Sequence, residues 1–123
     1  MEETYITFET SKLALEKGFN GYQYSSFYAN YYNCDGSVGN SLWQHLENKS
    51  PRYVTQSLLQ KWLREKHNLI VSIIPRFFTT VFYEYRILGI EVEVNSYDSY
   101  EDALENGLKC ALENIKNLNT DAE

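Results

Sequence analysis

Residues 99–115, SYEDALENGLKCALENI, carry the clearest structural pattern in the chain and decide its fold class. Ser99 stands three residues before Asp102, the spacing of a capping box, and acidic residues occupy the first turn. The apolar side chains that follow recur at intervals of three and four residues: Ala103, Leu104, Leu108, Ala111, Leu112, Ile115 and Leu118. This periodicity predicts a helix that buries one side. Gly107 lies on that side, which predicts a close approach to a neighbouring element.

Residues 55–68, TQSLLQKWLREKHN, predict a second helix. Thr55 is an N-cap residue, and Val54 and Leu59 have the spacing of a hydrophobic staple around it. The run Lys66-His67-Asn68 suits a helix C-terminus, where cations are favourable. The apolar side chains predict the buried stripe, which comprises Leu58, Leu59, Trp62 and Leu63.

A third helix is expected near the N-terminus, over residues 8–17. Thr7 would cap it, and Lys17 would supply a cation to the last turn. Gly18 would then adopt the left-handed conformation that ends a helix, so that Phe19 folds back onto the last turn.

Two further regions predict strands. Residues 22–32 alternate ahead of Asp35-Gly36, which is a signal for a type I′ hairpin turn. Later in the chain, three runs at 69–74, 79–88 and 90–94 predict an antiparallel meander, with the first run stopped by Pro75. Residues 38–50 carry no interpretable pattern.

The order of these elements predicts an α+β fold, in which a small antiparallel sheet (a hairpin plus a three-strand meander) packs against about three helices. A chain of 123 residues suits one domain, so we expect residues 1–123 to form a single domain with a frayed tail at 119–123.

Composition excludes several classes of function. A net charge of −6 argues against sequence-independent binding to duplex nucleic acid, which needs a positive surface. No apolar run approaches the roughly 20 residues that cross a bilayer, so we expect no membrane association. The acidic start MEETYITFET lacks the pattern of a signal peptide, and Cys34 and Cys110 suggest no disulfide framework. We therefore expect a protein of the bacterial cytoplasm.

Charge is also segregated along the chain. Five of the 11 basic residues lie between Lys49 and Lys66, whereas acidic residues dominate from Asp98 onward. Such segments suit either two solvated helix surfaces or opposed surfaces of neighbouring copies. Together with a polar, aromatic strand surface, they predict a homo-oligomer.

Catalytic and metal-binding motifs are missing from the sequence. The two Cys and two His residues are scattered, without the short spacings of a zinc site, and no phosphate loop, dinucleotide fingerprint or nucleophile elbow is present. Glu91 and Glu93 alternate with valines as in an ordinary half-exposed strand. We therefore expect no catalytic residues, no metal, no cofactor and no enzymatic activity.

Binding is the remaining class of function. Residues 21–36, GYQYSSFYANYYNCDG, hold five of the 11 tyrosines. They would cover a half-buried sheet, or would line a site where aromatic rings stack on a planar ligand while arginines and helix amides hold phosphates. The candidate ligand-binding residues are Tyr24, Tyr28, Tyr32, Trp43, Arg52, Thr55, Ser57 and Arg76.

The stretches TQSLLQKWLREKHNLIV (55–71) and SYEDALENGLKCALENI (99–115) resemble a family of short uncharacterised proteins of Bacteroides-type bacteria and their phages and prophages. An opening similar to TFETSKLALEKGFN (7–20) and a pair similar to Tyr31-Tyr32 also belong to that pattern. The matching residues are cap and core positions, so the resemblance implies a context and no catalytic residue. It implies a phage or prophage accessory protein, possible roles being sequestration of a nucleotide-like signal of host defence, or inhibition of a host protein through a tyrosine-rich surface.

Overall fold

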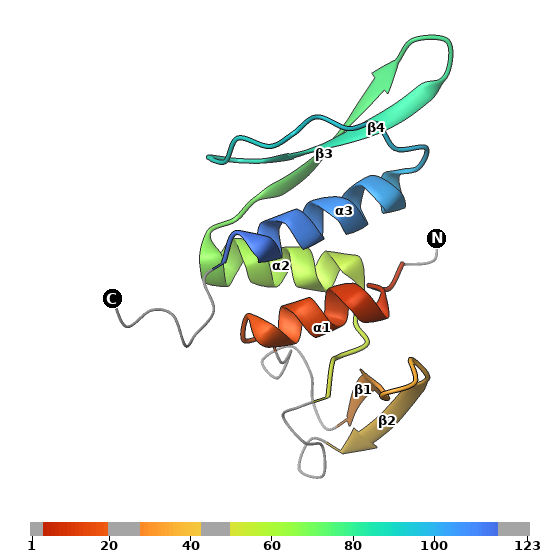
Figure 1. Ribbon diagram of the computed structural model, residues 1–123, viewed down its shortest axis with the longest axis vertical. Helices are drawn as coiled ribbons and strands as arrows, with labels where there is room; N and C mark the ends of the chain where they lie inside the picture. The colour runs from red at the N-terminus through yellow and green to blue at the C-terminus, as the bar shows by residue number, and fades with distance from the viewer. Residues whose placement is uncertain (1–3, 20–27, 43–49, 116–123) are drawn as a thin grey trace.

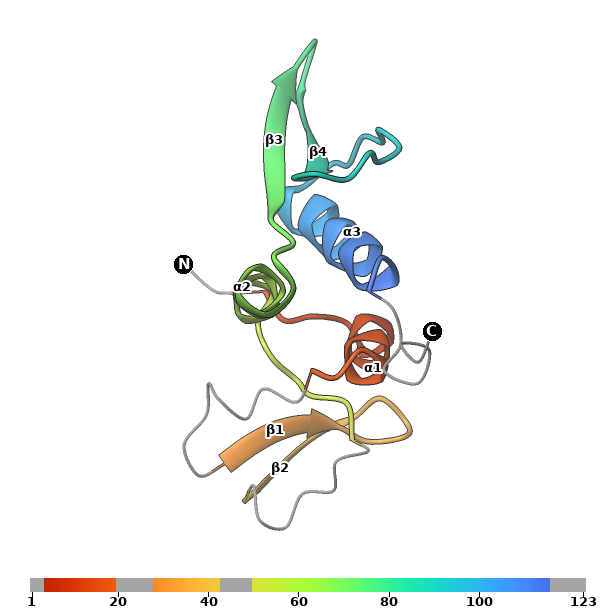
Figure 2. The same cartoon turned by 90° about the vertical axis from the view of Figure 1, so that its left-hand side faces the viewer.

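A computed structural model describes residues 4–19, 28–42 and 50–115 (Figure 1). It confirms the α+β class, with three helices and two antiparallel hairpins among the described residues. The hairpins lie on opposite sides of the helices (Figure 2). In chain order the elements are α1 (Phe8–Glu16), β1 (Tyr28–Tyr32), β2 (Val38–Leu42), α2 (Gln56–His67), β3 (Val71–Phe77), β4 (Val81–Ile87) and α3 (Tyr100–Glu113).

Local signals fix where the three helices begin and end. The side chains of Thr7, Thr55 and Ser99 accept hydrogen bonds from the backbone amides three residues further along, as expected for N-caps. Gly18 has a φ of 97° and ends α1, and Asn68 ends α2 with a φ of 57°. These predicted boundaries are confirmed.

The carboxylate of Glu105 in α3 joins the starts of all three helices. Its Oε2 accepts hydrogen bonds from the amide and the hydroxyl of Thr7, both at 2.9 Å. Its Oε1 accepts a 2.9 Å bond from the side chain of Gln56, which also donates to the Glu101 carbonyl. The three N-termini meet there, and the helices run in the same direction (Figure 1).

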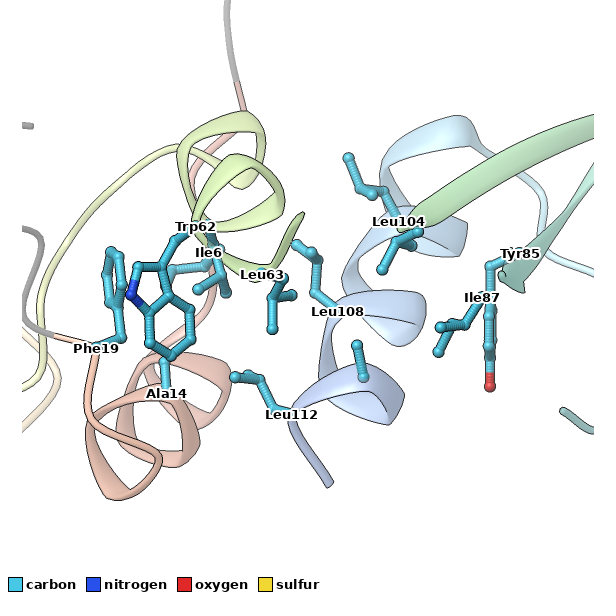
Figure 3. Close-up of a cluster of buried hydrophobic side chains, with 13 residues drawn as sticks. Ile6, Ala14, Phe19, Trp62, Leu63, Tyr85, Ile87, Leu104, Leu108 and Leu112 are labelled. Atoms are coloured by element: carbon cyan, nitrogen blue, oxygen red, sulfur yellow. The ribbon is translucent and has the colours of Figure 1, made fainter. Parts of the chain in front are cut away.

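The apolar core lies between the helices and continues beneath β3 and β4 (Figure 3). α3 packs against α1, α2 and the β3–β4 hairpin, and its side chains Leu108 and Leu112 are fully buried. At the other side of the core, the ring of Phe19 meets Trp62 edge-on at 5.1 Å. The prediction that Phe19 folds back onto α1 is confirmed by its amide, which bonds to the Ala14 carbonyl.

Gly107 allows α3 to approach the β3–β4 hairpin closely. A Cβ atom at this position would lie 2.9 Å from Val71 Cγ1 and 3.0 Å from Tyr85 Cβ. Both neighbours are held by the strand backbone, so neither yields easily. The predicted close approach is confirmed.

Residues 51–56 connect the β1–β2 hairpin to the helices. Tyr32 donates its amide to the Pro51 carbonyl and Tyr53 donates to the Asn30 carbonyl, which makes this segment a partner of β1. Further along, Gln56 and Val54 bond to the N-terminal segment before α1.

The β1–β2 hairpin is as predicted at Asp35-Gly36, but the predicted type I′ geometry of its turn is wrong. Gly36 has a positive φ and Asp35 does not, because the Asp35 carboxylate instead accepts bonds from Ser37.

The β3–β4 region corrects two expectations. Pro75 does not stop β3, which continues to Phe77, because an edge strand tolerates a residue without an amide hydrogen. The meander is also wrong, since residues 91–96 form no strand; the isolated bridges of Ile90 and Tyr97 to β4 flank this segment. Ile90 and Val92 pack partly against the core without strand pairing, which explains their alternation. The predicted single sheet is therefore two separate hairpins.

Replacing Glu105 by alanine tests the junction of the helix starts. We expect Glu105→Ala to lower the free energy of unfolding by about 1–3 kcal/mol, because it removes the charged group that accepts hydrogen bonds from both Thr7 and Gln56. Urea denaturation measures the effect. Glu113→Ala, an exposed change in the same helix, is the control, and equal stabilities of the two variants would contradict the role of Glu105.

Replacing Gly107 by alanine tests the close approach of α3. Alanine favours a helix by about 1 kcal/mol, but overpacking against Val71 and Tyr85 costs about 1–3 kcal/mol. We therefore expect Gly107→Ala to lower the denaturation midpoint. Asn106→Ala, at the preceding and less buried position, should leave it nearly unchanged; a stabilised Gly107→Ala variant would show that the contact is loose.

Candidate functional site

A groove of about 590 Å³ lies between α1 and the end of β1. Its volume falls within the range of about 300–1,000 Å³ that is usual for small-molecule sites. One stripe of α1 forms one side, because Phe8, Lys12, Leu15 and Glu16 recur at helical spacing. The other side consists of residues 32–34 together with Ser50 and Pro51.

Aromatic rings and one cation give the groove its chemistry. The rings of Phe8 and Tyr32 lie 5.2 Å apart at an angle of 45°. The ammonium group of Lys12 lies over the Phe8 ring, 4.6 Å from its centroid, which is a cation–π contact. Glu16 and the exposed thiol of Cys34 lie at the same groove. A planar ligand with an anionic group would find a cation to pair with, and would stack on the Phe8 ring by drawing the Lys12 ammonium away from it.

Tyr32 lines this groove but is largely a core residue. It is 9% exposed, and its hydroxyl donates a 2.6 Å hydrogen bond to the Ile6 carbonyl. Burial, together with the nearby Tyr53 and Glu105, raises the pKa of Tyr32, which keeps the phenol protonated as this bond requires. Tyr32 therefore offers a ligand part of its ring and not its hydroxyl.

Two further tyrosines near β1, Tyr31 and Tyr53, also contribute to packing. The ring of Tyr31 lies against Gly39 on β2, where a Cβ atom would be 2.7 Å from the ring. Tyr53 stacks on Tyr5 with centroids 4.2 Å apart. Tyr28 pairs with Leu42 at the start of β1. Tyr24 and Trp43 lie outside the described residues.

Arg52 is a structural residue in this position, with only 2% of its surface exposed. Its guanidinium donates to the Ser50 carbonyl, and its own carbonyl accepts the Ser11 hydroxyl. Burial lowers the pKa of Arg52. Its guanidinium holds the chain beside the groove and is not presented to a ligand on the surface.

Thr55 and Ser57 lie together at the start of α2. The Thr55 hydroxyl is occupied as the N-cap, bonding to the Leu58 amide at 3.2 Å. Ser57 is exposed and lines a pocket of about 150 Å³ that Glu101 also lines. The carboxylate makes this second pocket unfavourable for a phosphate.

The last predicted residue, Arg76, lies in β3 on the opposite side of the helices from Tyr32 (Figure 2). It forms an ion pair with Glu84 at 3.0 Å. The structure thus does not bring Arg76 together with Tyr32, Arg52 and Thr55. Sequence reasoning missed Phe8 and Lys12, although their spacing of four residues on a helix was a usable signal.

No protein-family model matches the chain, and searches of curated proteins and of solved structures give no significant match. The resemblance to short phage proteins therefore stays a prediction. Within the described ranges, no cluster of three or more His, Cys, Asp or Glu residues is placed to hold a metal ion. In the same ranges, no helix has the length and apolar character to span a membrane.

Substitution of Tyr32 separates packing from ligand contact. We expect Tyr32→Phe to lower the free energy of unfolding by about 1–3 kcal/mol, because the buried Ile6 carbonyl loses its donor. Thermal and urea denaturation measure the loss. Tyr100→Phe serves as the control because Tyr100 is 45% exposed. If Tyr32→Phe were as stable as the wild-type protein, the hydroxyl would not be needed for packing.

Proposed function

We propose that this protein is a non-catalytic binding protein that sequesters a small, planar, anionic molecule of nucleotide-like chemistry in the groove beside α1. The observation that carries this proposal is the combination of Phe8 and Lys12 on one wall of a groove of about 590 Å³. Stacking on an aromatic ring is tolerant of the identity of a base. A lysine ammonium pairs with an acidic group as a mobile point charge.

The polar groups of the groove favour a ligand with few charges. Lys12 contributes one positive charge and Glu16 one negative charge, so the groove has little positive charge to balance the negative charges of a polyphosphate. The start of α1 adds no anion site, because the Thr7 amide already donates to Glu105. A base or similar ring that carries a single phosphate or a related acidic group fits these constraints best.

The alternative, a host-protein inhibitor acting through the tyrosine-rich stretch, has less support. Tyr32 is buried, and Tyr31 packs against Gly39 within the hairpin. These two described rings are used for folding and leave little area for a partner. The groove is therefore the better candidate on this side of the molecule.

The biological setting in our proposal rests on the sequence resemblance. A phage or prophage accessory protein that holds a nucleotide-like molecule would remove a signal of host defence from solution. Self-association and a cytoplasmic location, both expected from the sequence, belong to the same proposal.

Ligand binding is tested with adenosine monophosphate and a cyclic dinucleotide of adenosine as probes. Native mass spectrometry of the protein purified from bacterial cells, repeated after denaturation, first shows whether a ligand co-purifies. Isothermal titration calorimetry then gives Kd for each probe. We expect Lys12→Met to raise Kd about tenfold or more, because it removes the charge and keeps an unbranched side chain over Phe8.

Lys61→Met is the matched control, since Lys61 is an exposed lysine on α2 and does not line the groove. It should leave Kd unchanged. Equal affinities of the wild-type protein and Lys12→Met would overturn the assignment of the groove. Failure of both probes to bind, together with no co-purifying ligand, would overturn sequestration of a nucleotide-like molecule.

A further inference from the structure

The tip of the β3–β4 hairpin exposes large apolar side chains. Phe77 is 75% exposed, Phe78 is 82% exposed and Val81, which pairs with Phe77, is 50% exposed. Phenylalanine is normally among the buried residues, so adjacent exposed rings need an explanation. Nearer α3 the same hairpin buries Val71, Tyr85 and Ile87. Within β3 and β4, the exposed large apolar side chains therefore lie at the end of the hairpin that extends beyond the helices (Figure 1).

The tip has a defined shape. Residues 78–80 form the turn, and the Phe78 amide donates a 3.2 Å hydrogen bond to the Thr80 carbonyl. Antiparallel pairing continues to the last residues on each side, Phe77 and Val81. The rings are thus carried by a hydrogen-bonded hairpin, which reduces the entropy lost when a partner holds them.

A partner strand added at the open edge of β3 is disfavoured. Leu88 donates its amide to the Ile70 carbonyl, so even-numbered residues of this strand bond to β4 and odd-numbered residues face the open edge. Pro75 is one of those odd-numbered residues and has no amide hydrogen to offer. Contact through the side chains at the tip is therefore favoured over strand addition at β3.

A second copy of this chain is a poor occupant for the tip. A buried aromatic side chain covers about 150–250 Å², so the exposed parts of two phenylalanines offer roughly 300 Å². A stable interface buries about 800 Å² on each partner. Two convex tips meeting side by side fall well short of that area, whereas a concave pocket surrounds a tip on all sides.

Charge at the base of the tip indicates what surrounds such a pocket. Arg76, which adjoins Phe77, lies 3.0 Å from Glu84, and Arg86, which lies further along β4 opposite Ser72, is 3.7 Å from the same carboxylate. Two cations therefore share one carboxylate. The arginine side chains are 47% and 41% exposed. Two copies would bring like charges together, whereas a partner with carboxylates would complete the pairing.

We propose that the β3–β4 hairpin docks into another protein, inserting Phe77 and Phe78 into an apolar pocket whose rim is acidic beside Arg76. Buried aromatic anchors surrounded by a polar rim are the usual arrangement of a protein–protein hot spot. This docking element is independent of the groove beside α1.

Photo-crosslinking tests the proposal. The exposed turn residue Thr79 is replaced by a benzophenone amino acid in cells that naturally contain the protein, and the crosslinked protein is identified by mass spectrometry. That protein is then purified, and Kd is measured by isothermal titration calorimetry at low and high salt. We expect the double variant Phe77→Ser, Phe78→Ser to weaken binding about hundredfold or more. Arg76→Ala should weaken it several-fold at low salt and less at high salt.

Leu88→Ser is the matched control, because Leu88 is 70% exposed at the other end of the hairpin. It should bind as the wild-type protein does, and urea denaturation should show all variants folded. A crosslinked product consisting of two copies of this chain, equal affinity of the double variant, or no crosslinked product at all would each overturn the proposal. Lys12→Met should not change the affinity for the crosslinked partner. A negative result for the docking proposal is therefore distinguishable from a negative result for ligand binding in the groove.

Discussion

The hydrogen bonds to the Glu105 carboxylate set the arrangement on which the remaining structure depends. They bring the starts of α1, α2 and α3 to one place, where the positive ends of three helix dipoles would otherwise repel one another. A carboxylate among these ends is therefore electrostatically favourable. Because parallel helices require the chain to return after each one, both connections must be long. The β1–β2 and β3–β4 hairpins lie within those connections.

The return connections place possible contact surfaces on opposite sides of the helices (Figure 2). The first connection brings residues 32–34 and 50–51 against the exposed stripe of α1, which creates the groove. The second extends beyond α3 and leaves its tip in solvent. Gly107 determines how close the second hairpin lies to α3, while the pairing of β1 with residues 51–53 determines where the first lies. Each surface is thus positioned by packing that takes no part in binding.

Sequence reasoning succeeded where the physical cause is local. Thr7, Thr55, Ser99 and Gly18 determine helix ends through bonds to residues three or four positions away, and all four were predicted. It failed where the cause lies far along the chain. The meander required residues 91–96 to pair along β4, but this segment forms no strand and is flanked by isolated bridges at Ile90 and Tyr97. Pro75 is tolerated because its nitrogen faces an open edge. The candidate site shows the same division, since the backbone of the buried Arg52 is held by the hydroxyl of Ser11, which lies 41 residues away in the sequence.

The exposed phenylalanines carry a cost that the rest of the hairpin offsets. An exposed apolar strand end favours aggregation by pairing with another edge. Pro75 removes a donor from the open edge, and Arg76 and Arg86 place like charges on any second copy that approaches. These features oppose self-pairing but leave the rings accessible. If solubility were the sole requirement on this surface, polar residues could stand in place of Phe77 and Phe78. The fold would lose little stability, because neither ring is buried. Protection of the edge combined with retained aromatic side chains therefore favours selection for contact with a different protein.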